Sequence, residues 1–189
     1  DAGESGWYVA SRSALEPLNP RRLTVDLKTC TDVRGLCSLA LHVKDFNRIH
    51  CVVALRSAHR LCASTSGMTD ETRRAVETIL DRTQEVSVHL SRPELKDLLS
   101  AVDQLGVTPR REVLDAILER ALDFARELPS DKSGTGWAAG VLEACRNLKV
   151  DQESELVRTL GDHVTRQAPS GALRGSSGED GGARGGESA

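Results

Sequence analysis

An apolar pattern at helical spacing recurs about every 40 residues along this chain. Its clearest copy ends at Gly106 and consists of Leu95, Leu98, Leu99, Val102 and Leu105. The same face recurs 44 residues earlier, at Cys51, Ala54, Leu55, Ala58 and Leu61, and 43 residues later, at Ala138, Val141, Leu142, Cys145 and Leu148. A repeat of this length is typical of stacked helix pairs, each of which buries its apolar face only against its neighbours.

The helix that follows each copy repeats as well. Four residues of the best copy match residues 38 positions earlier: Leu114, Ile117, Leu118 and Arg120 correspond to Val76, Ile79, Leu80 and Arg82. A second match lies 43 positions later, where Leu156, Val157, Leu160 and Val164 correspond to Val113, Leu114, Ile117 and Ala121. The pattern predicts an all-α fold, an α-solenoid of about three stacked antiparallel helix pairs preceded by one N-terminal helix. An aromatic content of only 3% suits such a core of small aliphatic side chains.

Composition divides the chain into three regions. Residues 1–30 contain scattered glycine and proline and predict an irregular leader that docks through Trp7 and Tyr8. Residues 31–168 carry the helical period and form the predicted repeat domain. Residues 169–189 are rich in glycine, so we expect a disordered tail that buries too little apolar surface to fold. Since the chain begins with Asp1, we also expect it to be processed or truncated.

Capping signals give the expected helix ends. Asn47 is placed to cap one helix, and Ser91, followed by a proline and then Glu94, is placed to cap the next. Gly106 is expected to end that helix. The dipeptide at 108–109 predicts another helix start, and residues 130–136 predict a loop.

No signature of catalysis is visible in the sequence. It has no phosphate-binding P-loop, no glycine-rich dinucleotide motif, no H-E-x-x-H and no C-x-x-C. The closest approach to metal-ligand spacing, His59 with Cys62, lacks convergent partners. The five cysteines are odd in number, and we expect free, mostly buried thiols in a reducing compartment. We therefore expect no enzyme activity, no metal and no cofactor.

One helix carries a basic stripe opposite its apolar face. No acidic residue occurs between Arg48 and Thr69. At 100° per residue, with Arg48 at 0°, His59 falls at about 20°, Arg56 at about 80° and Arg60 at about 120°. Arginines on such a surface can neutralise phosphates and stack on bases. The alternative is a solvated or partner-facing charged helix, and the net charge of −3 provides no overall attraction for nucleic acid.

The stretch from Leu90 to Val107, followed by residues 110–122, resembles the heptatricopeptide and octotricopeptide class of degenerate helix-pair repeats. Repeats of this class often precede a RAP domain in organellar proteins of protists and algae. The resemblance rests on the Leu105-Gly106 end of one helix and the stripe from Leu114 to Leu118 in the next, and it covers about residues 45–167. Similar stripes also suit tetratricopeptide or HEAT-like arrays.

The resemblance implies an RNA-binding α-solenoid of the mitochondrial matrix, or a solenoid built into a mitochondrial ribosome. Its partners would be organellar rRNA and neighbouring ribosomal proteins, without a membrane span or a small-molecule substrate. RNA would be read by exposed positions on the first helix of each pair. By register these positions hold Arg56 and Arg60, then Ser100 and Gln104, then Glu143 and Asn147. The expected RNA-binding residues are Arg48, Arg56, His59, Arg60 and Asn147.

Two other functions remain open on the sequence. One is a protein–protein scaffold whose groove binds a partner helix or peptide. The other is an accessory or structural subunit of a mitochondrial complex with no RNA contact. The overall acidic charge favours the scaffold, whereas the basic stripe and the resemblance favour RNA.

Overall fold

The chain is all-α in the part that the structure, a computed structural model, describes: residues 19–65 and 67–167, which contain no β-strand. The helices are α1 (Pro20–Thr29), α2 (Val33–Ala40), α3 (Arg48–Ser64), α4 (Asp70–Val86), α5 (Arg92–Leu105), α6 (Arg111–Arg126), α7 (Lys132–Asn147) and α8 (Glu155–Gln167). Two short 3-10 helices, η1 (Val43–Asp45) and η2 (Ser87–His89), lead into α3 and α5. The tail at 169–189 and the aromatic residues of the leader lie outside the described residues.

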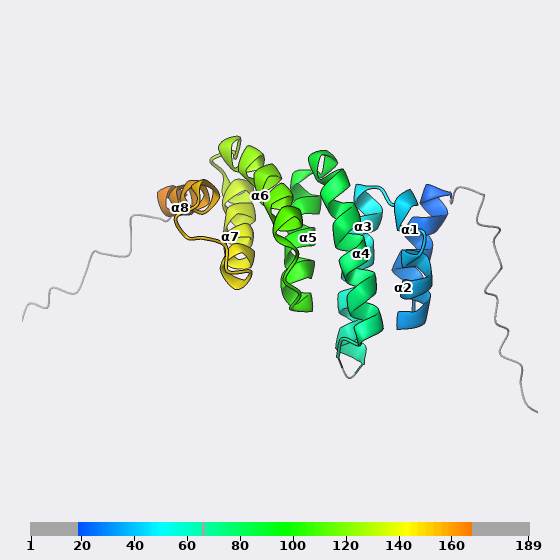
Figure 1. Cartoon of the computed structure of the whole chain (residues 1–189). Helices are drawn as coiled ribbons and strands as arrows, with labels where there is room; N and C mark the ends of the chain where they lie inside the picture. The colour runs from blue at the N-terminus through cyan, green and yellow to red at the C-terminus, as the bar shows by residue number, and fades with distance from the viewer. Residues whose placement is uncertain (1–18, 66, 168–189) are drawn as a thin grey trace, which may run out of the picture.

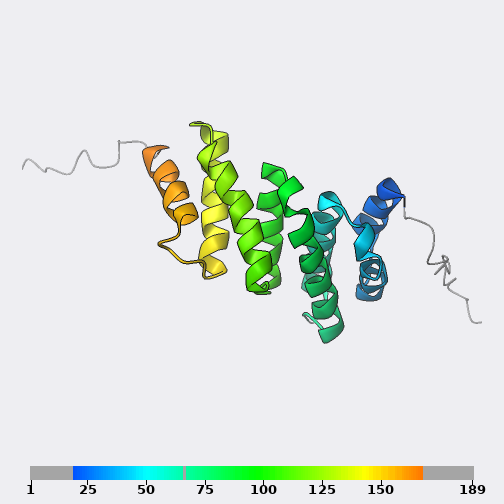
Figure 2. The same cartoon turned by 45° about the horizontal axis from the view of Figure 1, so that its top comes forward.

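The helices lie in two rows. The odd-numbered helices contact one another in the order α1, α3, α5, α7, and the even-numbered helices contact one another in the order α2, α4, α6, α8. The helices lie side by side in chain order, from α1 and α2 on one side of the molecule to α8 on the other (Figure 1). The turned view shows the same order (Figure 2). In their rows, α1 and α2 occupy the positions before α3 and α4.

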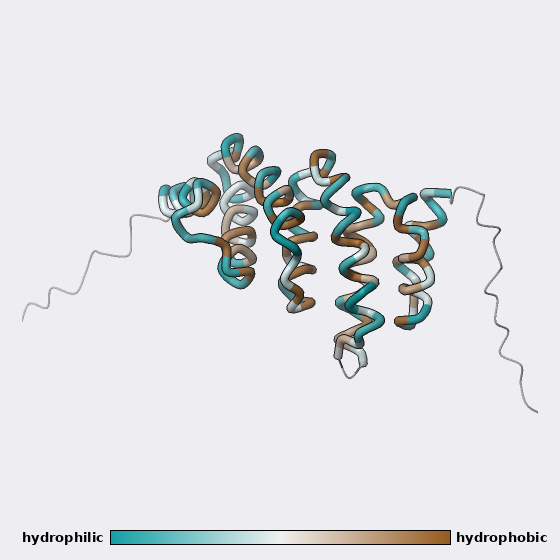
Figure 3. Tube along the Cα trace, in the orientation of Figure 1, coloured by the Kyte–Doolittle hydropathy of each residue, from teal (hydrophilic) through white to brown (hydrophobic). Residues whose placement is uncertain are grey.

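The recurring apolar stripe forms the core. Of the fifteen stripe residues named above on α3, α5 and α7, all are buried except Leu105, Leu142 and Leu148, which are half-buried. Apolar and polar residues therefore alternate along each helix, as the brown and teal segments of Figure 3 show. The predicted burial is confirmed at the other twelve positions.

Most predicted helix ends agree with the structure, and three differ. Asn47 caps α3, Glu94 closes a capping box with Ser91, and Gly106 ends α5 in the left-handed region at φ 63°. The expectation of an irregular leader to residue 30 is wrong for its last third, because Asn19 caps a helix that begins at Pro20. The start predicted at 108–109 is two residues early, since α6 begins at Arg111.

The predicted loop at 130–136 is also wrong, because α7 already begins at Lys132. The Asp131 carboxylate accepts a hydrogen bond of 2.8 Å from the Gly134 N–H and so caps the helix. Gly134 is buried, and a Cβ built there would lie 2.1 Å from the Pro129 carbonyl oxygen. Glycine at this position thus permits close packing of backbone on backbone and is not a loop signal.

An arginine on two even-numbered helices binds the loop that precedes its partner helix. Arg82 of α4 donates from Nε to the Phe46 carbonyl at 2.9 Å, just before α3. Arg120 of α6 donates from Nε to the Leu90 carbonyl at 3.2 Å, just before α5. These arginines occupy equivalent positions of the sequence repeat. Each therefore ties the two helices of one pair together at the same point.

A second recurring contact joins successive odd-numbered helices near their N-termini. His50 Nε2 lies 2.9 Å from the Pro20 carbonyl oxygen at the start of α1. By register His50 corresponds to Glu94 and to Trp137. The indole N–H of Trp137 donates to the Arg92 carbonyl at 2.8 Å, again at the start of the preceding odd-numbered helix. Glu94 makes the equivalent contact through side chains, with Arg48.

Loss of the arginine contact should destabilise the fold. We expect Arg82→Met to lower the free energy of unfolding by about 1–3 kcal/mol, because the Phe46 carbonyl loses its side-chain donor. Arg111→Met, whose parent side chain is 89% exposed, should change it by less than about 0.5 kcal/mol. Urea unfolding of both variants measures the difference. Equal losses would contradict a specific role for Arg82.

Two glycines of α7 should respond oppositely to alanine. Gly134→Ala should destabilise the chain by about 1–3 kcal/mol, since the new methyl group overlaps the Pro129 carbonyl. Gly136→Ala should stabilise it by about 0.5–1 kcal/mol, because no atom lies within 4 Å of its Cβ position and alanine favours the helix. Thermal unfolding separates the two variants. Stabilisation by both would mean that Gly134 is not closely packed.

Candidate nucleic-acid interface

Three of the five predicted RNA-binding residues lie together on one groove. The groove has a volume of about 570 Å³ and runs between α1, α3 and α5. Its lining is Lys28 from α1, Val53, Arg56, Ser57, His59 and Arg60 from α3, and Gln104 from α5. We name it the α3 groove. The lining includes three cationic side chains and no acidic one.

Arg60 binds the end of α1. Its guanidinium donates to the carbonyl oxygens of Lys28 at 2.9 Å and Cys30 at 2.8 Å. Cys30 is the C-cap residue of α1, where helix carbonyls lack partners within the helix and the helix dipole favours a positive charge. Arg60 therefore has a structural role at one wall of the α3 groove.

Arg56 forms an exposed ion pair across to α5. Its Nη1 lies 3.0 Å from Asp97 Oδ2, and the two side chains are 64% and 49% exposed. Exposed pairs of this kind contribute at most about 1 kcal/mol and exchange readily for other partners. The Arg56 guanidinium is therefore available to a phosphate at small cost.

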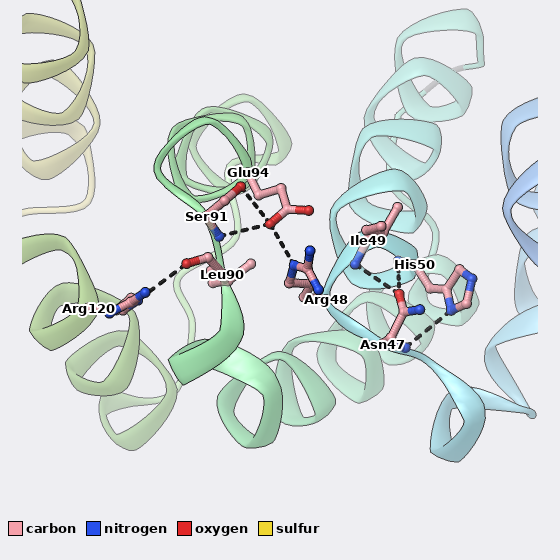
Figure 4. Close-up of polar contacts among 8 residues, drawn as sticks. All are labelled: Asn47, Arg48, Ile49, His50, Leu90, Ser91, Glu94 and Arg120. Atoms are coloured by element: carbon pink, nitrogen blue, oxygen red, sulfur yellow. Dashed lines mark hydrogen bonds and ion pairs between the residues drawn. The ribbon is translucent and has the colours of Figure 1, made fainter. Parts of the chain in front are cut away.

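Arg48 lies apart from the α3 groove, at the start of α3, and binds α5. Its Nε donates to Glu94 Oε2 at 2.9 Å, and the same oxygen accepts from the Ser91 N–H at 2.8 Å and hydroxyl at 2.7 Å (Figure 4). Burial acts to raise the pKa of Glu94. The hydrogen bonds from Ser91 and Arg48, together with the Arg48 charge, outweigh it and lower that pKa.

Asn147 is also separate from the groove. Its amide nitrogen on α7 donates to Asp103 Oδ2 of α5 at 2.9 Å. It therefore joins two odd-numbered helices, as Arg56 and Arg48 do. The structure gathers Arg56, His59 and Arg60 but leaves Arg48 and Asn147 in helix–helix contacts outside the α3 groove.

Sequence reasoning missed Lys28 as a groove residue, because it assigned residues 1–30 to an irregular leader. Lys28 is exposed on the last turn of α1 and adds a third cation to the groove. The signal that could have found it is Asn19 followed by Pro20, an N-cap with proline at the first helical position.

The cysteine thiols have little thiolate character. Burial raises the pKa of Cys51 and of Cys145 to about 11. Burial also raises the pKa of Cys30, Cys37 and Cys62 above the ordinary value. The thiolate is the reactive form, so these side chains are weak nucleophiles near neutral pH. All five are free, and Cys51 and Cys145 are fully buried, as their stripe positions predict. The expectation of mostly buried thiols is wrong for the other three, Cys30, Cys37 and Cys62, which are half-buried.

The described residues contain neither a cluster of metal ligands nor a membrane-spanning helix. No group of three or more His, Cys, Asp or Glu residues there is arranged to hold a metal ion. None of the described helices combines the length and apolar character that crossing a membrane requires.

In comparisons with known proteins, no family model, no curated protein and no solved structure matches the chain.

The Glu94 network should make stability depend on acid pH. The folded-state pKa is lowered, so the stabilisation is fully present above the unfolded value of about 4.3 and is lost as pH falls through the folded value. Glu94→Gln should remove up to about 1 kcal/mol at neutral pH and flatten this dependence. Glu77→Gln, an exposed change on α4, is the control. Urea unfolding between neutral and acid pH measures both, and parallel pH curves for wild type and Glu94→Gln would reject the network.

Proposed function

We propose that this chain is an α-solenoid of stacked antiparallel helix pairs that associates with RNA and has no catalytic activity of its own. The two rows of helices support the solenoid, because each pair contacts the next pair along both rows. The observation that carries the RNA proposal is the α3 groove, which is lined by Lys28, Arg56 and Arg60 and by no acidic residue, while the exposed Asp97 beside it pairs with Arg56. Such a surface suits the phosphates of a single strand, and His59 offers a ring on which a base can stack.

The cellular setting is proposed from the resemblance to organellar helix-pair repeats. We propose a mitochondrial matrix protein built into the mitochondrial ribosome, with organellar rRNA and ribosomal proteins as its neighbours. A fixed place in a ribonucleoprotein suits a groove in which only part of the surface is basic. It also suits the charge of the equivalent surface on α7, where Glu143 replaces the basic residues of α3.

Neutralising two cations of the α3 groove should weaken RNA binding. We expect Lys28→Gln with Arg56→Gln to lower affinity for a short mixed-sequence single-stranded RNA about tenfold, or ~1.4 kcal/mol. The slope of log affinity against log salt, measured between roughly 50 and 200 mM, should fall by about 1.4, since each single-strand phosphate contact contributes about 0.7. Arg60 is left intact because it caps α1.

The matched control removes the same charge elsewhere. Arg73→Gln with Arg158→Gln alters exposed residues of α4 and α8 that line no part of the α3 groove. This variant should keep both the affinity and the salt slope within about twofold of wild type. Equal losses in the two variants would show that RNA responds only to net charge and would reject the α3 groove as the site.

The second candidate function is a protein–protein scaffold, or an accessory subunit of a mitochondrial complex, without RNA contact. It is favoured by the contacts that Arg48, Arg56, Arg60 and Asn147 already make with neighbouring helices. Purification of the native protein from cells with and without ribonuclease separates the two functions. Recovery of ribosomal RNA with ribosomal proteins supports the first, and a protein complex that ribonuclease leaves unchanged supports the second.

A further inference from the structure

A second groove lies on the even-numbered row, between α2, η1 and α4. It has a volume of about 600 Å³, and its apolar lining is formed by Ala40, Leu41, Val43 and Ala75. Leu41 is 83% exposed, the most exposed large apolar side chain among the described residues. We name it the α2–α4 groove.

The groove exists because the first even-numbered helix is short. α2 has 8 residues and α4 has 17, so at 1.5 Å per residue α2 spans about 12 Å beside a helix of about 26 Å. The chain then leaves α2 through the η1 turn. Part of the α4 surface that a full-length neighbour would cover is therefore left to Leu41, Val43 and solvent.

The cations of the α2–α4 groove make no ion pairs among the described residues, whereas Arg56 of the α3 groove does. Three cations line it, Arg34 from α2, Lys44 from η1 and Arg74 from α4, and Glu71 is the single acidic residue of the lining. Among the residues that the structure describes, none of these three cations is within ion-pair distance of a carboxylate. An apolar floor whose rim carries a net positive charge complements a ligand that is apolar on one side and acidic on the other.

We propose that the α2–α4 groove binds an acidic amphipathic helix of a partner protein. The apolar side chains of that helix cover Leu41 and Val43, and its carboxylates reach Arg34, Lys44 and Arg74. A helix is favoured over an extended peptide because small side chains along the groove, including Ser38, Ala40 and Ala75, permit close approach of a helical ridge. RNA is disfavoured because it would leave the apolar floor uncovered.

This proposal is independent of RNA binding at the α3 groove, since the two grooves share no lining residue. The probe is a fluorescent synthetic peptide with leucines at i, i+3 and i+4 of each heptad and glutamates at the remaining positions, titrated with the full chain and followed by anisotropy. Arg34→Glu with Arg74→Glu should weaken its binding at least tenfold. Arg73→Glu with Arg158→Glu, which reverses two exposed charges outside the groove, should change it less than twofold.

Two further measurements guard against an unfolded variant. The first uses a basic peptide with lysine in place of every glutamate, which should bind wild type at least tenfold more weakly than the acidic peptide does. For the Arg34→Glu, Arg74→Glu protein the order should reverse, so that the basic peptide binds more tightly than the acidic one. Leu41→Gln alters an exposed side chain, so the fold should persist while acidic-peptide affinity falls at least threefold.

Four results would overturn the proposal. The first is no saturable binding of the acidic peptide, or binding that is equal in all variants. The second is displacement of the peptide by RNA at the same residues. The third is a gain in peptide affinity when residues 1–18 are removed, which would identify the chain's own N-terminal segment as the occupant. The fourth is self-association that Arg34→Glu with Arg74→Glu abolishes, which would identify a second copy.

Discussion

A helix pair with an apolar stripe on one face is stable only when another pair covers that stripe, and the arrangement of this chain follows from this requirement. The stripe residues of α3, α5 and α7 are buried by contact along the odd-numbered row, and α4, α6 and α8 pack along the even-numbered row. Directional contacts then set the geometry of each step. Arg82 and Arg120 tie the helices within a pair, while His50, Glu94 and Trp137 tie each odd-numbered helix to the one before it.

The use of positive charge distinguishes the two grooves. On the odd-numbered row, Arg48, Arg56 and Arg60 all bind groups on a neighbouring helix, so a ligand there competes with contacts inside the protein. On the even-numbered row, the cations of the α2–α4 groove make no ion pair with any described carboxylate. A ligand there gains charge interactions without breaking any within the described residues. The two grooves therefore differ in the internal contacts that a ligand would have to displace.

The sequence predicted much of the fold because the fold depends on local signals. The stripe, the Asn47 cap and the left-handed Gly106 each follow from a few adjacent residues. The errors arose where one residue type fits two structures: Pro20 begins a helix, and Gly134 lies inside one. The basic stripe of α3 was predicted from helical periodicity. Its acidic partners, Glu94 and Asp97, could not be predicted, because they lie more than 40 residues away in the chain. The α2–α4 groove was missed for the same reason, since three elements contribute to it.

Arg60 links the α3 groove to the folding of the first helix pair. α1 has only ten residues, and a helix of that length is marginal on its own, so it relies on partners such as the guanidinium that satisfies the Lys28 and Cys30 carbonyls. A ligand that withdraws Arg60 would loosen α1. By reciprocity, unfolding of the first pair would release Arg60 and also move Lys28 away from the groove. The order of α1 and the occupancy of the α3 groove are therefore coupled through Arg60, so that a change in one alters the other.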